Sequence, residues 1–128
     1  MKANVRFEDA ASHEVLYEGA ASLDRNGNSV EIRMKSPEVE SIWKILPRGI
    51  VMENRSEITS IIRLFDSKRG RAHILSPYGE MEAELSDVSI ERLEDAVQIG
   101  YAIEDQHFSF SLSWQTLTDP AVSASMDR

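Results

Sequence analysis

The sequence contains no cysteine. A disulfide framework, a thiolate zinc site and a cysteine nucleophile are therefore all excluded. A chain without thiols also fits a reducing compartment, where disulfides are rare.

Long apolar runs are missing as well. No stretch of the sequence approaches the roughly 18 apolar residues that a membrane-spanning helix needs. Charged residues interrupt positions 1–9 every few residues, so this segment lacks the apolar region of a secretory signal peptide. We therefore expect a cytoplasmic protein.

Positive charge is scarce relative to negative charge. The chain has 14 Lys and Arg against 22 Asp and Glu, which gives a formal net charge of -8. Affinity for nucleic acid depends on neutralising phosphates with basic side chains, and attraction to anionic lipid has the same origin. We expect neither nucleic acid nor a membrane as a partner.

Recognisable catalytic and metal-binding motifs are absent too. The sequence has no glycine-rich phosphate loop, no G-x-S-x-G elbow and no H-E-x-x-H pattern. Its three histidines do not lie at the spacing of metal ligands: His13, His73 and His107. The sequence therefore predicts a protein that is not an enzyme and has no cofactor or metal.

The strongest positive pattern is the alternation of apolar and polar residues. It runs through four stretches, at residues 30–35, 80–85, 97–104 and 107–114. Successive side chains of a strand point to opposite faces, so each stretch can bury one row and expose the other. This pattern predicts an antiparallel sheet, in which Glu80, Glu82 and Glu84 form a solvated outer row.

Turn residues separate these stretches. Asn26-Gly27 is a strong hairpin signal, because both residue types tolerate positive φ. Further turns are predicted at residues 47–49, 67–70, 76–79, 91–95 and 104–106. The spacing predicts an all-β antiparallel meander of about eight to ten strands, closed into a barrel or split into a sandwich. We expect one domain over residues 1–116 and a flexible C-terminal tail over residues 117–128.

One segment supports two interpretations. Ile58, Ile61, Ile62 and Phe65 have the i, i+3, i+4, i+7 spacing of an amphipathic helix. The same segment also alternates, and its isoleucine and threonine content favours a strand.

Aromatic side chains are predicted mostly on the inward faces of the strands: Trp43, Phe65, Tyr101, Phe108, Phe110 and Trp114. In a small barrel such residues either fill the interior or line a pocket. Arg55 and Arg63 lie within apolar strands, so they point either inward, as anchors for an anion, or outward into solvent. The candidate ligand-binding residues are Arg55, Arg63, Trp43, Tyr78 and Tyr101.

The middle of the chain resembles a known family. Arg55, Phe65 ten residues later and the turn at residues 76–79 (Ser-Pro-Tyr-Gly) resemble the YwiB-like family of small uncharacterised bacterial proteins. The sequence departs from the family pattern at Ser56, Ile74 and Ser76, where a glycine, an aromatic residue and a threonine are common.

This resemblance extends over residues 3–115, because the closing pair of stretches at residues 97–103 and 108–114 also fits. It implies a lipocalin-like (calycin) β-barrel, with residues 57–65 as a strand. Lipocalin-like barrels often hold small apolar ligands, so the resemblance implies, by analogy of fold, a small apolar ligand inside the barrel.

Two hypotheses about function follow. The first is a non-catalytic protein that binds a small apolar or anionic ligand inside the barrel. The second is a structural or regulatory interaction module with a filled barrel, which acts through its outer surface or an exposed strand edge and self-associates as a homodimer.

Overall fold

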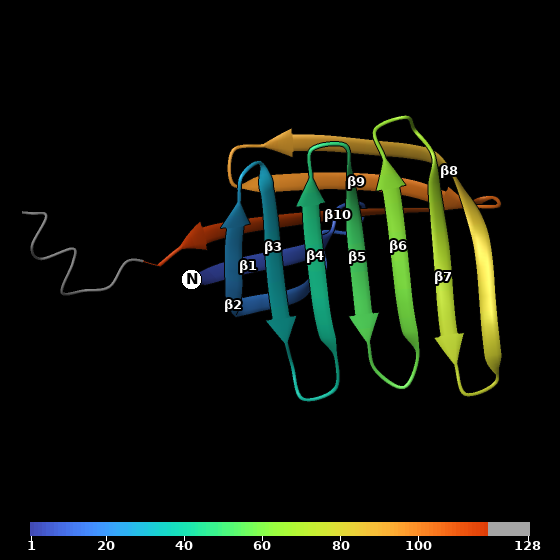
Figure 1. The fold of residues 1–128 in the computed structure, drawn as a ribbon, viewed down its shortest axis with the longest axis horizontal. Helices are drawn as coiled ribbons and strands as arrows, with labels where there is room; N and C mark the ends of the chain where they lie inside the picture. Colours follow the sequence, from blue (N-terminus) through green and yellow to red (C-terminus); the bar gives the residue numbers. More distant parts are fainter. Residues whose placement is uncertain (118–128) are drawn as a thin grey trace, which may run out of the picture.

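A computed structural model describes residues 1–117, which form ten strands (Figure 1). In chain order they are β1 (Lys2–Asp9), β2 (Val15–Asn26), β3 (Ser29–Lys35), β4 (Glu40–Leu46), β5 (Gly49–Arg55), β6 (Thr59–Phe65), β7 (Gly70–Ser76), β8 (Gly79–Leu93), β9 (Ala96–Ile103) and β10 (Gln106–Thr116). The described part of the chain contains no helix.

Each strand pairs antiparallel with the next, and β1 also pairs with β10, so the sheet closes into a barrel. In the closing pair, Val5 lies opposite Trp114, and both side chains are buried. Closure removes the exposed edges that a flat sheet would leave open to other chains. The predicted all-β antiparallel meander is confirmed, and the barrel alternative is correct.

The barrel is flattened into two layers whose strands cross (Figure 1). β3 to β7 run side by side in one layer, while β1, β9 and β10 cross behind them. The long strand β8 passes from one layer to the other. Its pairing with β9 shifts between Ser86 and Ser89, and Asp87 has a φ of 49°. A bulge of this kind bends a strand and increases its local twist, which allows one strand to belong to both layers.

The segment with two interpretations is a strand. β6 pairs with β5 on one side and with β7 on the other, so its backbone groups are committed to the sheet. Ile62 and Leu64 point into the barrel, while Ile61 and Phe65 lie in the outward-facing row. The helical interpretation of this segment is therefore wrong, because Ile61 and Phe65 lie on the outer face while Ile62 lies in the core.

The barrel interior is packed with large apolar side chains. The largest fully buried ones are Trp43, Leu23, Ile32, Ile50, Leu64, Leu112 and Val97. No polar or charged residue of the described part belongs to the buried class. Burial of this apolar surface is the main favourable contribution to folding.

β10 ends at Thr116, and the backbone N–H of Leu117 donates a hydrogen bond to the carbonyl of Lys2 at 3.0 Å. The remainder of the predicted tail, residues 118–128, lies outside the described residues. Within residues 1–117, no helix is long and apolar enough to cross a membrane.

Candidate functional site

Two candidate residues lie inside the barrel, where they fill space. Trp43 is 1% exposed, and its ring contacts Phe7 edge-on at a centroid distance of 5.3 Å. Tyr101 is 8% exposed and stacks on Phe108 at 5.4 Å, and burial raises the pKa of its hydroxyl above 10.0. These contacts use the aromatic faces that a ligand would otherwise occupy.

A small cavity remains at the end of the barrel where the β1–β2 and β3–β4 connections lie. Its volume is about 250 Å³, and it is lined by Phe7, Leu16, Tyr17, Met34, Ser36, Val39, Ser41 and Asn54. Inside it, the hydroxyl of Ser41 donates a hydrogen bond to Oδ1 of Asn54 at 2.6 Å. Ligand pockets usually begin at about 300 Å³, so this cavity is small for a ligand site.

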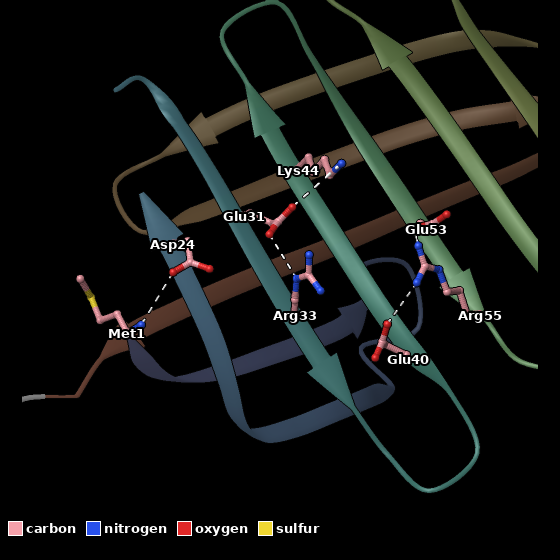
Figure 2. Close-up of polar contacts among 8 residues, drawn as sticks. All are labelled: Met1, Asp24, Glu31, Arg33, Glu40, Lys44, Glu53 and Arg55. Carbon is pink, nitrogen blue, oxygen red and sulfur yellow. Dashed lines mark hydrogen bonds and ion pairs between the residues drawn. The ribbon is translucent and has the colours of Figure 1, made fainter. Parts of the chain in front are cut away.

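Arg55 lies on the outer face of the barrel. Its guanidinium contacts Glu53 at 2.9 Å and Glu40 at 3.6 Å (Figure 2). The inward alternative for this residue is wrong, and its charge is neutralised by two carboxylates on the surface.

Arg63 also points outward, because its neighbours Ile62 and Leu64 point into the core. Tyr78 is 99% exposed in the β7–β8 turn. The structure therefore does not bring the five candidate residues together. Two are in the core, two are on the outer face and one is at the tip of a turn, and a ligand role for any of them stays a prediction.

The outer face nevertheless contains an unusual group of arginines. Elsewhere in residues 1–117, each arginine contacts a carboxylate within 4.0 Å; these paired residues are Arg6, Arg25, Arg33, Arg55 and Arg92. Figure 2 shows one such group, in which Glu31 lies between Arg33 and Lys44. Within the same range, the arginines without an ion pair are Arg48, Arg63, Arg69 and Arg71, which we call the arginine corner.

The cross-strand register concentrates this charge. Arg63 on β6 lies directly opposite Arg71 on β7. Like charges in directly opposed positions destabilise a sheet. On its other side Arg71 lies opposite Glu84 on β8, but the two form no ion pair within 4.0 Å.

Phe65 lies at the centre of the arginine corner. Sequence patterning placed its ring inside the barrel, which is wrong: Phe65 belongs to the outward row and is 45% exposed. It is paired with Gly49, where a Cβ would come within 2.4 Å of the carbonyl oxygen of Leu64. The close approach of β5 and β6 at this point therefore requires glycine.

Two surface depressions meet at Phe65. The basic depression has a volume of about 820 Å³ and is lined by Arg63, Phe65, Ser67, Arg69, Gly70, Arg71, Glu84 and Leu85. The apolar groove has a volume of about 430 Å³ and is lined by Leu46, Pro47, Arg48, Gly49, Ile50, Val51, Leu64 and Phe65. Three of the unpaired arginines thus line the basic depression, Arg48 lines the apolar groove, and the exposed ring of Phe65 lines both.

The loops of this corner are held together by hydrogen bonds. Arg92 on β8 donates to Oδ1 of Asp66 at 3.1 Å and to the carbonyl of Leu46 at 2.8 Å. The backbone N–H of Asp66 donates to the carbonyl of Arg48 at 3.0 Å. These bonds connect the β4–β5 turn to the β6–β7 turn, so the two depressions keep a fixed relative position.

The chemistry available at this corner is anion recognition. A guanidinium presents donors in a planar fork that matches a carboxylate or a phosphate. No cluster of potential metal ligands occurs in the described part of the chain. The sequence identified Arg63 as a candidate but missed Arg48, Arg69 and Arg71, because their proximity depends on the register of β6 with β7 and on the packing of two turns.

Comparison with known proteins gives a fold relationship. No family model matches the sequence, and no curated protein sequence matches it closely. The crystal structure of the ywiB protein from Bacillus subtilis superposes with a TM-score of 0.60, over 91% of this chain and 89% of that chain, at 15% sequence identity. A similarity at this identity establishes a shared fold. The resemblance to the YwiB-like family that the sequence suggested is thus confirmed at the level of the fold, a closed antiparallel β-barrel.

Proposed function

We propose that this protein is a non-catalytic interaction module, whose filled barrel presents the arginine corner to a negatively charged segment of a partner protein. The observation that carries the proposal is the direct opposition of Arg63 and Arg71 without an ion-pair partner in residues 1–117. A partner's carboxylates would relieve the repulsion between the two guanidinium groups and form charge-assisted hydrogen bonds with them.

The packing of the interior supports a function on the outer surface. Trp43 and Tyr101 are in contact with other aromatic rings, and Arg55 and Arg63 are outside. An anionic ligand inside the barrel would therefore lack a guanidinium group to bind it. Arginine and exposed aromatic residues are, in contrast, the types that are enriched at protein interfaces.

The test uses a short acidic peptide, hexa-L-glutamate, as the probe at low ionic strength, because a short segment can contact the arginine corner without meeting the acidic row on β8. We expect the wild-type protein to bind it at least about tenfold more tightly than the double variant Arg63→Gln, Arg71→Gln, because one lost charge contact corresponds to about that factor. The control variant Arg33→Gln removes an arginine that is already paired with Glu31, and it should bind like the wild type. Equal binding by all three proteins would refute the proposal.

A second candidate function is supported by the cavity near Ser41. Its polar lining includes the hydrogen-bonded Ser41–Asn54 pair, and no charged side chain lines it. This arrangement fits a small neutral ligand rather than an anionic one. Native mass spectrometry of gently purified protein tests this candidate: a bound small molecule lost on Asn54→Leu substitution supports it, whereas an unliganded mass for the wild type counts against it.

Two further properties belong to this proposal. The absence of cysteine supports a cytoplasmic location. The closed barrel supports a lipocalin-like relationship, in which the interior is filled rather than hollow.

A further inference from the structure

We infer that the partner contributes a short acidic peptide segment with one large apolar side chain, which occupies the apolar groove while its carboxylates contact Arg63 and Arg71. This inference rests on the proposed function and specifies the chemistry of the partner. It follows from the position of Phe65, which lines both the basic depression and the apolar groove.

The apolar groove provides the first part of the argument. Pro47 is exposed, Val51 is half-buried and the ring of Phe65 is 45% exposed. Apolar side chains of the groove therefore face solvent beside the charged side chain of Arg48. A single apolar side chain could cover these surfaces and gain the free energy of removing them from water. The groove has a volume of about 430 Å³ and is open to solvent, which suits a side chain presented from a peptide.

The surroundings of the arginine corner limit the size of its partner. Glu84 lies opposite Arg71 in the register, and it begins an exposed row on β8 that continues through Glu82 and Glu80. This acidic row borders the basic depression on one side, and the net charge of the whole chain is -8. An extended polyanion or a charged lipid surface would meet the acidic row as well as the arginines. A short segment that contacts only the arginine corner would avoid the acidic row.

The rigidity of the corner provides the third part. Arg92 is bonded to Asp66 and to the carbonyl of Leu46, so it anchors the turns on both sides of Phe65. Groups that are already in position lose less conformational freedom on binding, which increases affinity. The paired cation Arg92 therefore organises the site, and the unpaired cations remain available to a ligand.

The experiment selects ligands from a display library of random peptides against the full-length protein. We expect the enriched peptides to combine Asp or Glu with one Phe, Leu, Ile or Trp, and one such peptide is then titrated by isothermal calorimetry. Both Arg63→Gln, Arg71→Gln and Phe65→Ser should weaken its binding at least about tenfold. Arg33→Gln is the matched control and should change affinity less than about twofold. Circular dichroism confirms that each variant is folded.

The outcomes separate this inference from the proposed function. If the arginine variant weakens binding but Phe65→Ser does not, the proposed function stands and the apolar contact is refuted. If neither variant weakens binding, both are refuted. Arginine-dependent binding to phosphatidylglycerol vesicles or to RNA, without enriched acidic peptides, would overturn the inference in favour of those partners. Arginine-dependent self-association in sedimentation experiments, through the acidic row of a second copy, would overturn it in favour of a homo-oligomer.

Discussion

Arg63 and Arg71 lie directly opposite each other on β6 and β7, and neither forms an ion pair within residues 1–117. On the rest of the described surface, arginines contact carboxylates, as Arg33 contacts Glu31 at 3.1 Å. The arginine corner therefore retains an electrostatic repulsion that a single substitution could remove. The pair therefore lowers the stability of the free protein, and a bound carboxylate would relieve the repulsion.

Replacing Arg63 with glutamate should stabilise the protein. The substitution Arg63→Glu converts a like-charge pair into an opposite-charge pair with Arg71, which is worth about 0.2–1 kcal/mol across two strands. The measurement is the free energy of unfolding in urea at low salt. The matched variant Arg33→Glu should be destabilised, because it places a second carboxylate beside Glu31. A loss of stability in both variants would show that Arg63 and Arg71 do not repel each other appreciably.

The stability of the barrel should fall at high pH partly because of Tyr101. Burial raises the pKa of Tyr101 above its ordinary value of 10.0, so the unfolded chain loses this proton at a lower pH than the folded protein does. The contribution to stability is therefore fully present below about pH 10 and is lost as the pH rises through the folded-state pKa. Urea unfolding at about pH 9 and about pH 11 measures this loss. Tyr101→Phe should lose less stability over this interval than the wild type, and an equal loss would assign the effect to other groups.

The filled interior predicts a large cost for removing a central side chain. Trp43 is 1% exposed and contacts Phe7, so Trp43→Ala should destabilise the barrel by about 3–5 kcal/mol. Tyr78 is 99% exposed, and Tyr78→Ala should change stability by less than about 0.5 kcal/mol. Thermal unfolding followed by circular dichroism compares the two. A mild effect of Trp43→Ala would indicate a hollow, adaptable interior.

Gly49 should tolerate no side chain. A Cβ at this position would lie 2.4 Å from the carbonyl oxygen of Leu64, so Gly49→Ala forces β5 and β6 apart beside Phe65. We expect a loss of about 1–3 kcal/mol, in the range of an overpacked core position. The melting temperature measures the effect, and an unchanged value would show that the two strands separate easily.

The sequence predicted the architecture well because alternation and turn residues are local signals. Val97 and Ile99 alternate with polar neighbours, and Asn26-Gly27 marks a hairpin, so both features are visible without knowledge of the fold. The bulge near Asp87 in β8 was not visible, because it depends on how the two layers cross.

The candidate site was harder to predict because its geometry is non-local. Alternation defines two rows in each strand, and Phe65 was grouped with the inward-facing aromatic residues although it lies in the outward row of β6. The opposition of Arg63 and Arg71 depends on the length of the β6–β7 turn, which sets the register. One of the two carboxylates that neutralise Arg55 is Glu40, which lies on a different strand. Such relationships become apparent only when the strands are paired.

The most direct test of the central claim is to map the binding of a selected acidic peptide by backbone amide chemical shifts. The account places the ligand outside a filled barrel, so the largest shifts should fall on Arg48, Phe65 and Arg71, while the amide of Trp43 should remain unchanged. Shifts concentrated instead around the cavity at Tyr17, Ser41 and Asn54 would contradict it, because they would place the ligand inside the barrel.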